Sequence, residues 1–548
     1  MDSTQEETRK LRRIVFATSA GTVFEAYDFI LFGSLAPIIS VQFFSGVNPT
    51  AAFIFTLMTF AAGFVVRPLG ALVFGSMGDR TGRKKAFLIT IAMMGGATFA
   101  IGLLPTYATI GIWAPILLIA LRMIQGLAFG GEYGGAVVYT AEHAPDNKRG
   151  LFVGFIQTAA GFALFASFLI IFLTRSALGD ESFEAWGWRI PFLLSIFLLA
   201  ISLWIRMSLE ESPMFQKMLA EGKAAKRPLR EAFGQWKHLK LVILVLLGLM
   251  MLQGIVFYTA HFYSQFFITQ ILKLPTGTMT IVMLVVTGIS VPFYLFFSWL
   301  SDRVGRKPII LAGGILAVVS GFPLFNAMTA VVNPALAEAQ QSSPIVIMAD
   351  PAECSVQLDP VGQADFISSC DIAKSTFATL GVSYSNQEAQ ANALTIISIG
   401  ESTVESVDGA NLSADELEIA KAQFQTRLNE ALRNAGYPEG VNVDEVNLVL
   451  LGLLIFPLII ASTMTYAPCS AMAVELFPTR IRYTGLSLPY HIGSGWFGGF
   501  LPAIAFAMVA ANGSIYFGLW YPTIMAAISV LVLAFLLPET KGRNLNDI

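Results

Sequence analysis

Long apolar stretches dominate this chain and limit what it can fold into. A helix that crosses a bilayer needs about 20 mostly apolar residues, and by that rule we place twelve spans in the 548 residues. They lie near 14–39, 51–75, 86–104, 111–139, 151–174, 189–207, 241–268, 277–300, 308–330, 447–470, 482–510 and 514–537. Only 13% of the residues are charged, about half the share of soluble domains. The sequence therefore predicts an all-α membrane protein of twelve transmembrane helices.

Positive charge is sorted between alternate loops. The loops on one side of the twelve spans hold 25 of the 34 Lys and Arg, eight of them in or beside the central loop 208–240. Cationic residues accumulate on the cytoplasmic side of membrane proteins. We therefore expect these loops and both termini to be cytoplasmic, and the chain to be a multi-pass protein of a cell membrane, most simply a bacterial inner membrane.

The chain also repeats itself. Asp79-Arg80-Thr-Gly-Arg83 after the second span matches Asp302-Arg303-Val-Gly-Arg306 after the eighth. Glu142-x-x-Pro-x-x-x-Arg149 matches Glu475-x-x-Pro-x-x-x-Arg482, and Glu211-Ser-Pro weakly echoes Glu539-Thr-Lys. Such repeats indicate two six-helix bundles with a site between them. The predicted domains are the first bundle at 1–207, a central loop at 208–240, helices seven to nine at 241–330, an insert at 331–446, and the last three helices with a tail at 447–548.

The insert at 331–446 is acidic, with 17 Asp and Glu against four Lys and Arg. Loop parity places it on the extracytoplasmic side. Short apolar runs at 345–348 and 394–398 suggest strands, and Ser413-x-x-Glu416 is a capping box that opens a helix to about Asn434. We expect a small α+β domain. Cys354 and Cys370 lie on the oxidising side and can form a disulfide, although two free thiols are the alternative.

The Asp-Arg-x-Gly-Arg loop at both positions resembles the signature of the major facilitator superfamily. Further motifs resemble its metabolite–proton symporter family, and they are Glu25-x-Tyr27-Asp28-Phe29, Arg67-Pro-Leu-Gly70, Arg122-x-x-Gln125-Gly126, Trp188-Arg189-Ile-Pro191 and Glu475-Leu-Phe-Pro478. The resemblance implies the major facilitator fold. Similar members carry carboxylates such as citrate, oxoglutarate or shikimate, or zwitterions such as proline and betaine. The acidic insert has no counterpart in that family's usual compact pattern.

Ionisable residues inside spans are the first candidates for function, because burying a charge in a bilayer is costly. Glu25 and Asp28 share one face of the first helix, and Arg122 lies at a similar depth in the fourth. A buried carboxylate facing an arginine can act as a proton-coupling switch, since both burial and nearby charge shift its pKa. We expect Asp28 to accept the proton, with Glu25 as substitute. The alternative is a static ion pair that fixes helix packing.

A second set of polar and aromatic residues in the spans is predicted to bind substrate. The set is Tyr27, Arg67, Arg122, Gln125, Gln157, Tyr258 and His261. Arg67 can grip a carboxylate, Tyr27 and Tyr258 can stack on a quaternary ammonium, and His261 titrates near neutral pH. Arg67, His261 and the two tyrosines each have a structural alternative as ordinary packing residues.

The repeated loops are predicted to form a cytoplasmic gate. Its members are Asp79, Arg80, Arg83, Glu142, Arg149, Asp302, Arg303, Arg306, Glu475 and Arg482. We expect Asp79 and Asp302 to pair with Arg83, Arg149 or Arg482 and to hold that side shut. The alternative is a set of plain basic loops that only obey the topology.

These features predict a secondary active transporter that carries a small polar organic metabolite with protons by alternating access. The sequence has no Walker loop, no nucleophile elbow and no metal-ligand cluster among four His and three Cys, so we expect no enzyme activity, cofactor or metal. The expected partners are substrate, protons and membrane lipid, without nucleic acid, and the expected state is a monomer. The alternatives are a sugar or polyol porter, an exporter of the same fold, and a nutrient sensor that uses the outer domain.

Overall fold

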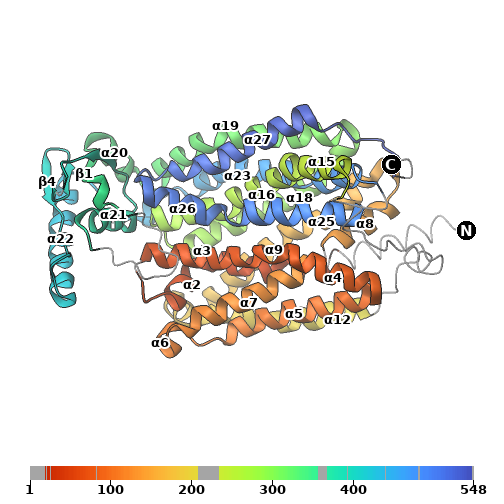
Figure 1. The fold of residues 1–548 in the computed structure, drawn as a ribbon, viewed down its shortest axis with the longest axis horizontal. Coiled ribbons are helices and arrows are strands. Elements are labelled where there is room, and N and C mark those ends of the chain that lie inside the picture. Colours follow the sequence, from red (N-terminus) through yellow and green to blue (C-terminus); the bar gives the residue numbers. More distant parts are fainter. Residues whose placement is uncertain are drawn as a thin grey trace, which may run out of the picture.

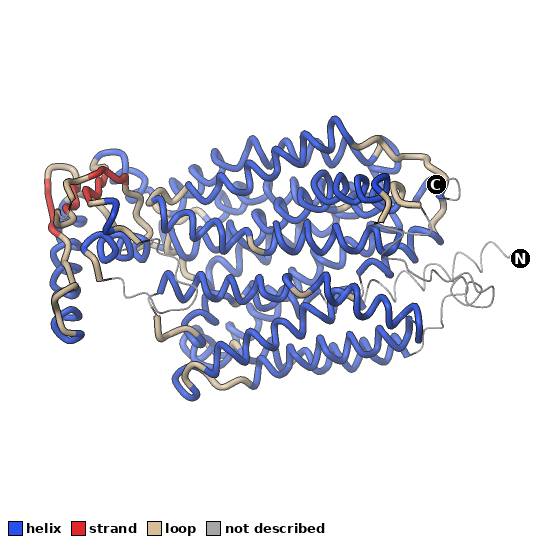
Figure 2. The backbone as a smooth tube through the Cα atoms, viewed as in Figure 1, coloured by secondary structure: helices blue, strands red, loops and turns tan. Residues whose placement is uncertain are grey.

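The structure, a computed structural model, describes residues 19, 21–24, 26–47, 49–81, 83–131, 133–207, 234–355, 367–391, 393–438, 440–478 and 482–545. Its helices run side by side along the long axis, and a small mixed domain lies at one end (Figure 1). Strands occur only in that small domain among the described residues (Figure 2).

The first bundle, red to orange in Figure 1, contains the first six spans. Its helices are Gly21–Ser34, α2 (Ala36–Phe43), α3 (Pro49–Val65), α4 (Arg67–Thr81), α5 (Arg83–Leu103), α6 (Tyr107–Ile110), α7 (Trp113–Gly130), α8 (Tyr133–His143), η1 (Asp146–Lys148), α9 (Arg149–Leu178), α10 (Asp180–Ser182), η2 (Phe183–Gly187), α11 (Arg189–Leu193) and α12 (Ser195–Met207). Gly126 lets α7 approach α3 closely, because a Cβ there would lie 1.8 Å from the carbonyl oxygen of Gly63.

The second bundle, green to blue, contains the other six spans. Its helices are α15 (Trp236–Val245), η3 (Leu246–Met250), α16 (Met251–Tyr258), η4 (Thr259–Tyr263), α17 (Ser264–Phe266), η5 (Phe267–Ile271), α18 (Thr276–Val304), α19 (Arg306–Val332), α23 (Leu448–Tyr466), α24 (Cys469–Val474), α25 (Arg482–Tyr490), η8 (His491–Gly498), α26 (Leu501–Asn512), η9 (Phe517–Leu519) and α27 (Trp520–Leu536). The two bundles meet along α9 and α18 and along α3 and η8.

Within the described residues, nine helices are long and apolar enough to cross a membrane, two further spans are bent pairs, and Leu88–Leu103 is a shorter apolar helix. These correspond one to one with the twelve predicted spans. The first span was expected to be continuous, but it bends by 62° after Ser34. The predicted sixth span is preceded by a helix at Asp180–Gly187, which meets it at 49°. Pro37 and Pro191 explain both bends, since a proline ring clashes with the carbonyl four residues earlier and removes one helical hydrogen bond.

The insert follows α19 and folds as a four-stranded sheet with helices. Its elements are α20 (Pro334–Ser342), β1 (Ile345–Ala349), η6 (Pro351–Glu353), α21 (Ser369–Leu380), β2 (Ser385–Glu388), β3 (Ile396–Ile399), β4 (Ser402–Glu405), α22 (Ala414–Asn434) and η7 (Val443–Glu445). The strand order is β2-β1-β3-β4, with β1 parallel to β2 and the other pairs antiparallel. The helix expected from Ser413 is confirmed, because α22 carries the full capping box with Glu416.

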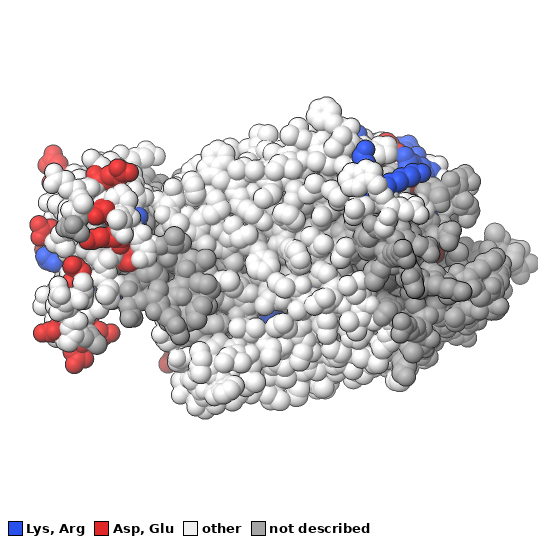
Figure 3. All heavy atoms as spheres, in the orientation of Figure 1, with Lys and Arg blue, Asp and Glu red and all other residues white. Residues whose placement is uncertain are grey.

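Two further features of the insert concern its covalent closure and its charge. A disulfide joins Cys354 to Cys370, whose Cα atoms are 5.2 Å apart, and it ties the end of η6 to the first turn of α21. On the face drawn in Figure 3, acidic side chains gather on the insert, whereas Lys and Arg gather at the opposite end of the bundles. The charge asymmetry in the sequence is therefore an asymmetry between the two ends of the molecule.

Candidate functional site

A charged cluster joins the two bundles at the end far from the insert. Glu475, which follows α24, is fully buried and accepts hydrogen bonds at Oε1 from Arg149 (3.1 Å) and Arg306 (3.2 Å). Its Oε2 accepts from the Thr540 hydroxyl at 2.6 Å. Arg149 opens α9 of the first bundle, so this carboxylate holds residues of both bundles together.

Two further links cross between the bundles at the same end. Arg482 donates to Glu142 at 2.9 Å. Asp302 accepts from the backbone N–H groups of Gly150 (2.8 Å) and Leu151 (2.9 Å) and pairs with Arg306 at 2.8 Å. Asp302 therefore pairs with neither Arg149 nor Arg482 in the described structure, and the third predicted partner, Arg83, has no described side chain. The first turn of α9 supplies N–H donors for this carboxylate that have no partner within the helix. Arg149 pairs with Glu475, and Arg482 pairs with Glu142.

Four other predicted gate residues contribute no described link between the bundles. Arg303 lies 4.0 Å above the Trp299 ring on its own helix, and its carbonyl accepts from Lys541. The backbones of Asp79, Arg80 and Arg83 lie in α4 and α5, but their side chains fall outside the described part of the structure.

The segment after α27 also belongs to this cluster. Besides Thr540, the carbonyl of Arg543 accepts from Arg149 at 3.1 Å, and the carbonyl of Leu545 accepts from Arg482 at 3.2 Å. The sequence missed Arg543 and Leu545, because main-chain acceptors leave no trace in residue type. The weak echo at Glu539-Thr-Lys was the one signal that pointed to this segment.

In the middle of the first bundle, a chain of polar contacts connects Asp28 to Arg122. Arg122 is fully buried and donates to the carbonyls of Phe29 (3.4 Å) and Phe60 (3.2 Å) and to Oε1 of Gln125 (2.8 Å). Nε2 of Gln125 donates to the hydroxyl of Thr98 at 2.7 Å, and this hydroxyl donates to the Met94 carbonyl at 2.9 Å. The buried Asp28 lies beside Thr98.

The arrangement differs from the direct pairing of acid and base that we expected. No ion pair joins Asp28 and Arg122 in the described structure, and Oδ1 of Asp28 has no hydrogen-bond partner there. The arginine is held instead by main-chain carbonyls and Gln125, so Thr98 and Gln125 separate the two charges. Thr98 was missed by the sequence analysis, because a lone threonine in an apolar span carries no distinctive pattern. Glu25 lies outside the described residues.

Arg67 lies where α3 gives way to α4, and it is 3% exposed. Its guanidinium stacks over the rings of Phe29 (4.0 Å), Phe64 (4.3 Å) and Phe129 (4.0 Å). Across the interface between the bundles it interacts electrostatically with three tyrosines of the second bundle. They are Tyr258, Tyr466 and Tyr490.

Arg67 therefore offers a buried positive charge between the bundles. Tyr466 and Tyr490 were not predicted, because aromatic residues in apolar spans look the same whether they line a site or pack in a core.

The other predicted substrate residues make hydrogen bonds to different parts of the protein. Gln157 bridges the bundles, since its Nε2 donates to the Tyr466 carbonyl (3.1 Å) and to Ser470 (2.8 Å). The Tyr27 hydroxyl donates to the Pro191 carbonyl at 3.0 Å, which joins the first and sixth spans. Nδ1 of His261 bonds within its own helix, 3.0 Å from the Phe257 carbonyl.

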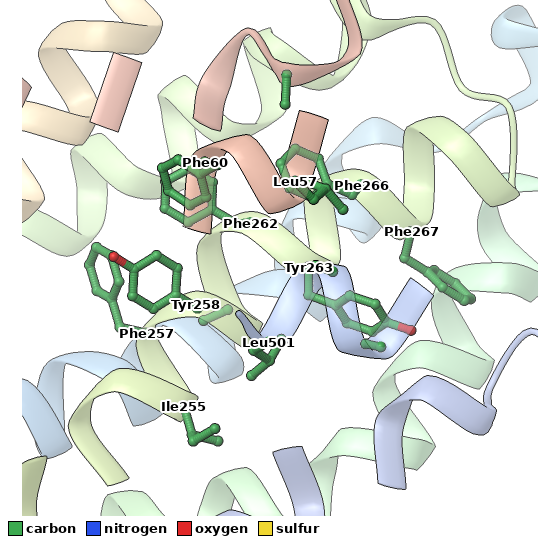
Figure 4. Packing of buried hydrophobic residues seen from close by; sticks show 14 of the residues in the cluster. Leu57, Phe60, Ile255, Phe257, Tyr258, Phe262, Tyr263, Phe266, Phe267 and Leu501 are labelled. Carbon is green, nitrogen blue, oxygen red and sulfur yellow. The ribbon is translucent and has the colours of Figure 1, made fainter. Parts of the chain in front are cut away.

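An aromatic layer closes the bundles at the end next to the insert, which we call the insert side. Tyr258 and Phe262 face Phe60 across the interface, with ring centroids 6.1 and 5.5 Å away (Figure 4). Nearer the insert, Phe53 of α3 packs edge-on against Phe266 (5.2 Å) and Phe506 (5.1 Å) of the second bundle. The bundles are therefore in contact at both ends, through ion pairs at one and aromatic rings at the other.

Comparisons with known proteins agree with this architecture. A family model described as sugar (and other) transporter matches residues 14–349 and 437–548, and it omits most of the insert. The chain is 38% identical over 340 residues to a shikimate transporter of Escherichia coli (strain K12), covering 60% of this chain and 77% of that protein. It is 37% identical over 338 residues to a proline/betaine transporter of Salmonella typhimurium (strain LT2), covering 59% and 66%. A solved structure of the xylose transporter XylE from E. coli, partially occluded and inward open, matches with a TM-score of 0.60 at 17% identity, covering 97% and 99%.

Proposed function

Because the chain belongs to the sugar (and other) transporter family of the major facilitator superfamily, we propose that it carries a small carboxylate-bearing metabolite together with protons by alternating access. It is a multi-pass membrane transporter of small metabolites, not an enzyme. The proposal adds the substrate class, the coupling ion and the residues that serve each.

The observation that supports the substrate class is the position of Arg67. A buried charge is costly unless a partner of opposite sign accompanies it, and the aromatic rings around Arg67 offset only part of that cost. A substrate carboxylate between the guanidinium and the hydroxyls of Tyr258 and Tyr490 would give the guanidinium a partner of opposite sign. Shikimate, proline and betaine, which give two similar transporters their names, all carry a carboxylate.

Asp28 is the residue we propose to carry the proton. It is a buried ionisable residue in the first span, and such residues are costly to place there and are therefore candidates for function. Thr98 lies beside it and is connected through Gln125 to Arg122. A proton gained or lost at Asp28 therefore changes the charge at one end of a continuous polar chain inside the first bundle.

The two closures at opposite ends provide the alternating gates. Transport requires that the charged cluster and the aromatic layer open in turn, between states that differ by a few kcal/mol. We place the charged cluster at the cytoplasmic end, because cationic residues favour that side, and the insert outside the cytoplasm.

The experiment compares the wild type with Asp28→Asn in proteoliposomes, using radiolabelled shikimate and glycine betaine as probes. The wild type should accumulate a probe when an inward proton gradient is imposed, and a protonophore should abolish accumulation. The variant should retain exchange in counterflow but lose accumulation, because an amide cannot exchange a proton. Ser40→Ala, a buried change in the first span, controls for folding. Accumulation of a probe by Asp28→Asn would overturn the coupling assignment. If the wild type takes up xylose but neither shikimate nor glycine betaine, a sugar porter would be favoured.

A further inference from the structure

The insert lies across the end of both bundles. Its helix α21 packs against α3 of the first bundle and α26 of the second. A cavity of about 80 Å³ lies at this junction and is lined by Phe53 of α3, Phe377 of α21 and Phe506 of α26. One insert helix therefore bridges the two bodies that have to separate when the mouth on the insert side opens.

The insert is fastened to the second bundle by hydrogen bonds. The backbone N–H of Tyr384 donates to the Gly513 carbonyl at 3.1 Å, and the N–H of Ile515 donates to the Ser383 hydroxyl at 3.2 Å. The side chain of Asn386 donates to the carbonyl of Asn512 at 2.9 Å. These bonds attach the start of β2 to the turn after α26, and α19 and α23 of the same bundle join the two ends of the insert.

The end of α21 also fits closely on the seventh span. Gly381 caps α21 with a φ of 71°, and a Cβ at this position would lie 2.4 Å from the carbonyl oxygen of Ile271. Only glycine combines this backbone conformation with so close an approach. The position of α21 is therefore fixed relative to η5 and α26.

The described contact between the insert and the first bundle is apolar, unlike the hydrogen-bonded contact with the second bundle. It consists of apolar side chains around the cavity, with Phe53 as the member from α3. Phe53 is also the ring that packs on Phe266 and Phe506 in the aromatic layer. Apolar contacts are not directional and can separate without leaving buried donors unpaired, so this is the contact we expect to break.

We propose that the insert is a lid that moves with the second bundle and, through α21, stabilises the state in which the insert side is closed. The proposal rests on the alternating access of the proposed function. When α3 and α26 separate, α21 has to leave α3 and expose the side chains around the cavity. Weakening this contact should shift the population toward the open state, and fixing it should stop transport.

Cys469 provides a test that needs no substrate. It is buried at the start of α24, and it is the single cysteine outside the disulfide. Phe377→Ala should make a maleimide added from the insert side modify Cys469 at least about threefold faster, because the open state becomes more populated. Ile419→Ala, on the exposed face of α22, should leave the rate unchanged. Equal rates in wild type and Phe377→Ala would overturn the lid.

A pair of cross-links tests the same idea through transport. In a Cys469→Ala background, a short cleavable bis-maleimide should link Phe53→Cys to Phe377→Cys across the breaking contact. The matched control pair is Asn386→Cys in the insert with Asn512→Cys in the second bundle, two parts that are proposed to move together. The first link should reduce counterflow about tenfold or more until it is cleaved, and the second should leave it within about twofold. Full counterflow with the first link intact, or equal loss with both, would contradict the lid. A failure of proton coupling would change neither result, because counterflow needs no gradient.

Discussion

Arg149 and Glu475 lie 3.1 Å apart and are both at most 1% exposed, although 326 residues separate them in the chain. The arginine opens α9 in the first bundle, and the carboxylate follows α24 in the second. Arg306 and Thr540 share the same carboxylate. This buried acid therefore joins both bundles at the end opposite the insert, beside the links made by Asp302 and Glu142.

The first prediction concerns that acid. Glu475→Gln removes the buried carboxylate that Arg149 and Arg306 share, which leaves Arg306 with Asp302 and Arg149 with the exposed Asp146. Breaking a buried ion pair costs about 3–5 kcal/mol. We expect a lower melting temperature in detergent and faster thiol modification of Cys469. Asp146→Asn is the matched control, because Asp146 also pairs with Arg149 but is 65% exposed. An exposed pair contributes about 0–1 kcal/mol, so similar effects of both variants would contradict the central role of Glu475.

The second prediction separates Arg67 from Arg122. Arg67→Lys keeps a positive charge but loses the planar group that stacks on three rings and grips a carboxylate. It should raise KM for a carboxylate substrate about tenfold or more while the protein remains folded. Arg122 is held by main-chain carbonyls, so Arg122→Lys should mainly lower the melting temperature. An unchanged KM for Arg67→Lys would remove Arg67 from the substrate site.

The extent to which the sequence anticipated the structure depends on the type of residue. Charged motifs at helix ends, such as those around Glu142, Arg149 and Glu475, could be found because each half repeats them at the same boundary. The apolar spans and the helix opened by Ser413 could also be predicted, because the length of an apolar run and a capping box are local features of the sequence. The site between the bundles was harder to predict from the sequence. Tyr466 and Tyr490 sit among many aromatic residues, and only tertiary packing brings them near Arg67.

Charge pairing was also beyond the sequence. Motif spacing places Asp302 and Arg149 at the same end of the molecule but does not decide which carboxylate meets which arginine. The free N–H groups of α9 settle that choice for Asp302. In the same way, depth along the spans placed Asp28 and Arg122 at one level, but rotation of each helix left Thr98 and Gln125 between them.

The third prediction addresses this polar chain. Thr98→Val removes the hydroxyl that accepts from Gln125, and an unpaired buried donor costs about 1–3 kcal/mol. If Thr98 positions Asp28, the pH profile of uptake should shift as well as the melting temperature. Thr56→Val is the control, because Thr56 is equally buried and, like Thr98, bonds to a carbonyl one turn earlier. A loss of stability without any shift of the pH profile would leave Thr98 a packing residue.

The fourth prediction concerns the disulfide of the insert. Cys354 and Cys370 close a loop with a sequence separation of 16, and a disulfide over a loop of this length contributes about 3 kcal/mol. Replacing both with serine should make the insert more sensitive to protease added from the insert side. The bundles should melt at the wild-type temperature, because the bridge lies wholly within the insert. Unchanged proteolysis would mean that the insert is stabilised by its packing on the bundles.

The last prediction uses Glu539, which caps the ninth span from the segment after α27. Its carboxylate accepts from the backbone N–H groups of Arg306 and Lys307 at 3.0 Å each and from Thr540 and Lys541 at 2.8 Å each. Partial burial raises the pKa of Glu539, but these four donors outweigh it and hold the pKa below its ordinary value. Stability from an acid with a lowered pKa is present at neutral pH and is lost as the pH falls through that lowered value.

Glu539→Gln should therefore melt earlier than the wild type at neutral pH, by an amount typical of an anion at a helix N-terminus, about 0.3–1 kcal/mol. The difference in melting temperature between the wild type and the variant should stay constant between about pH 6 and pH 8. It should narrow only below pH 4.5, the ordinary pKa of glutamate. Glu401→Gln, an exposed change in the insert, should show no gap at any pH. A gap that persists unchanged in acid would mean that Glu539 acts through its shape and not through its charge.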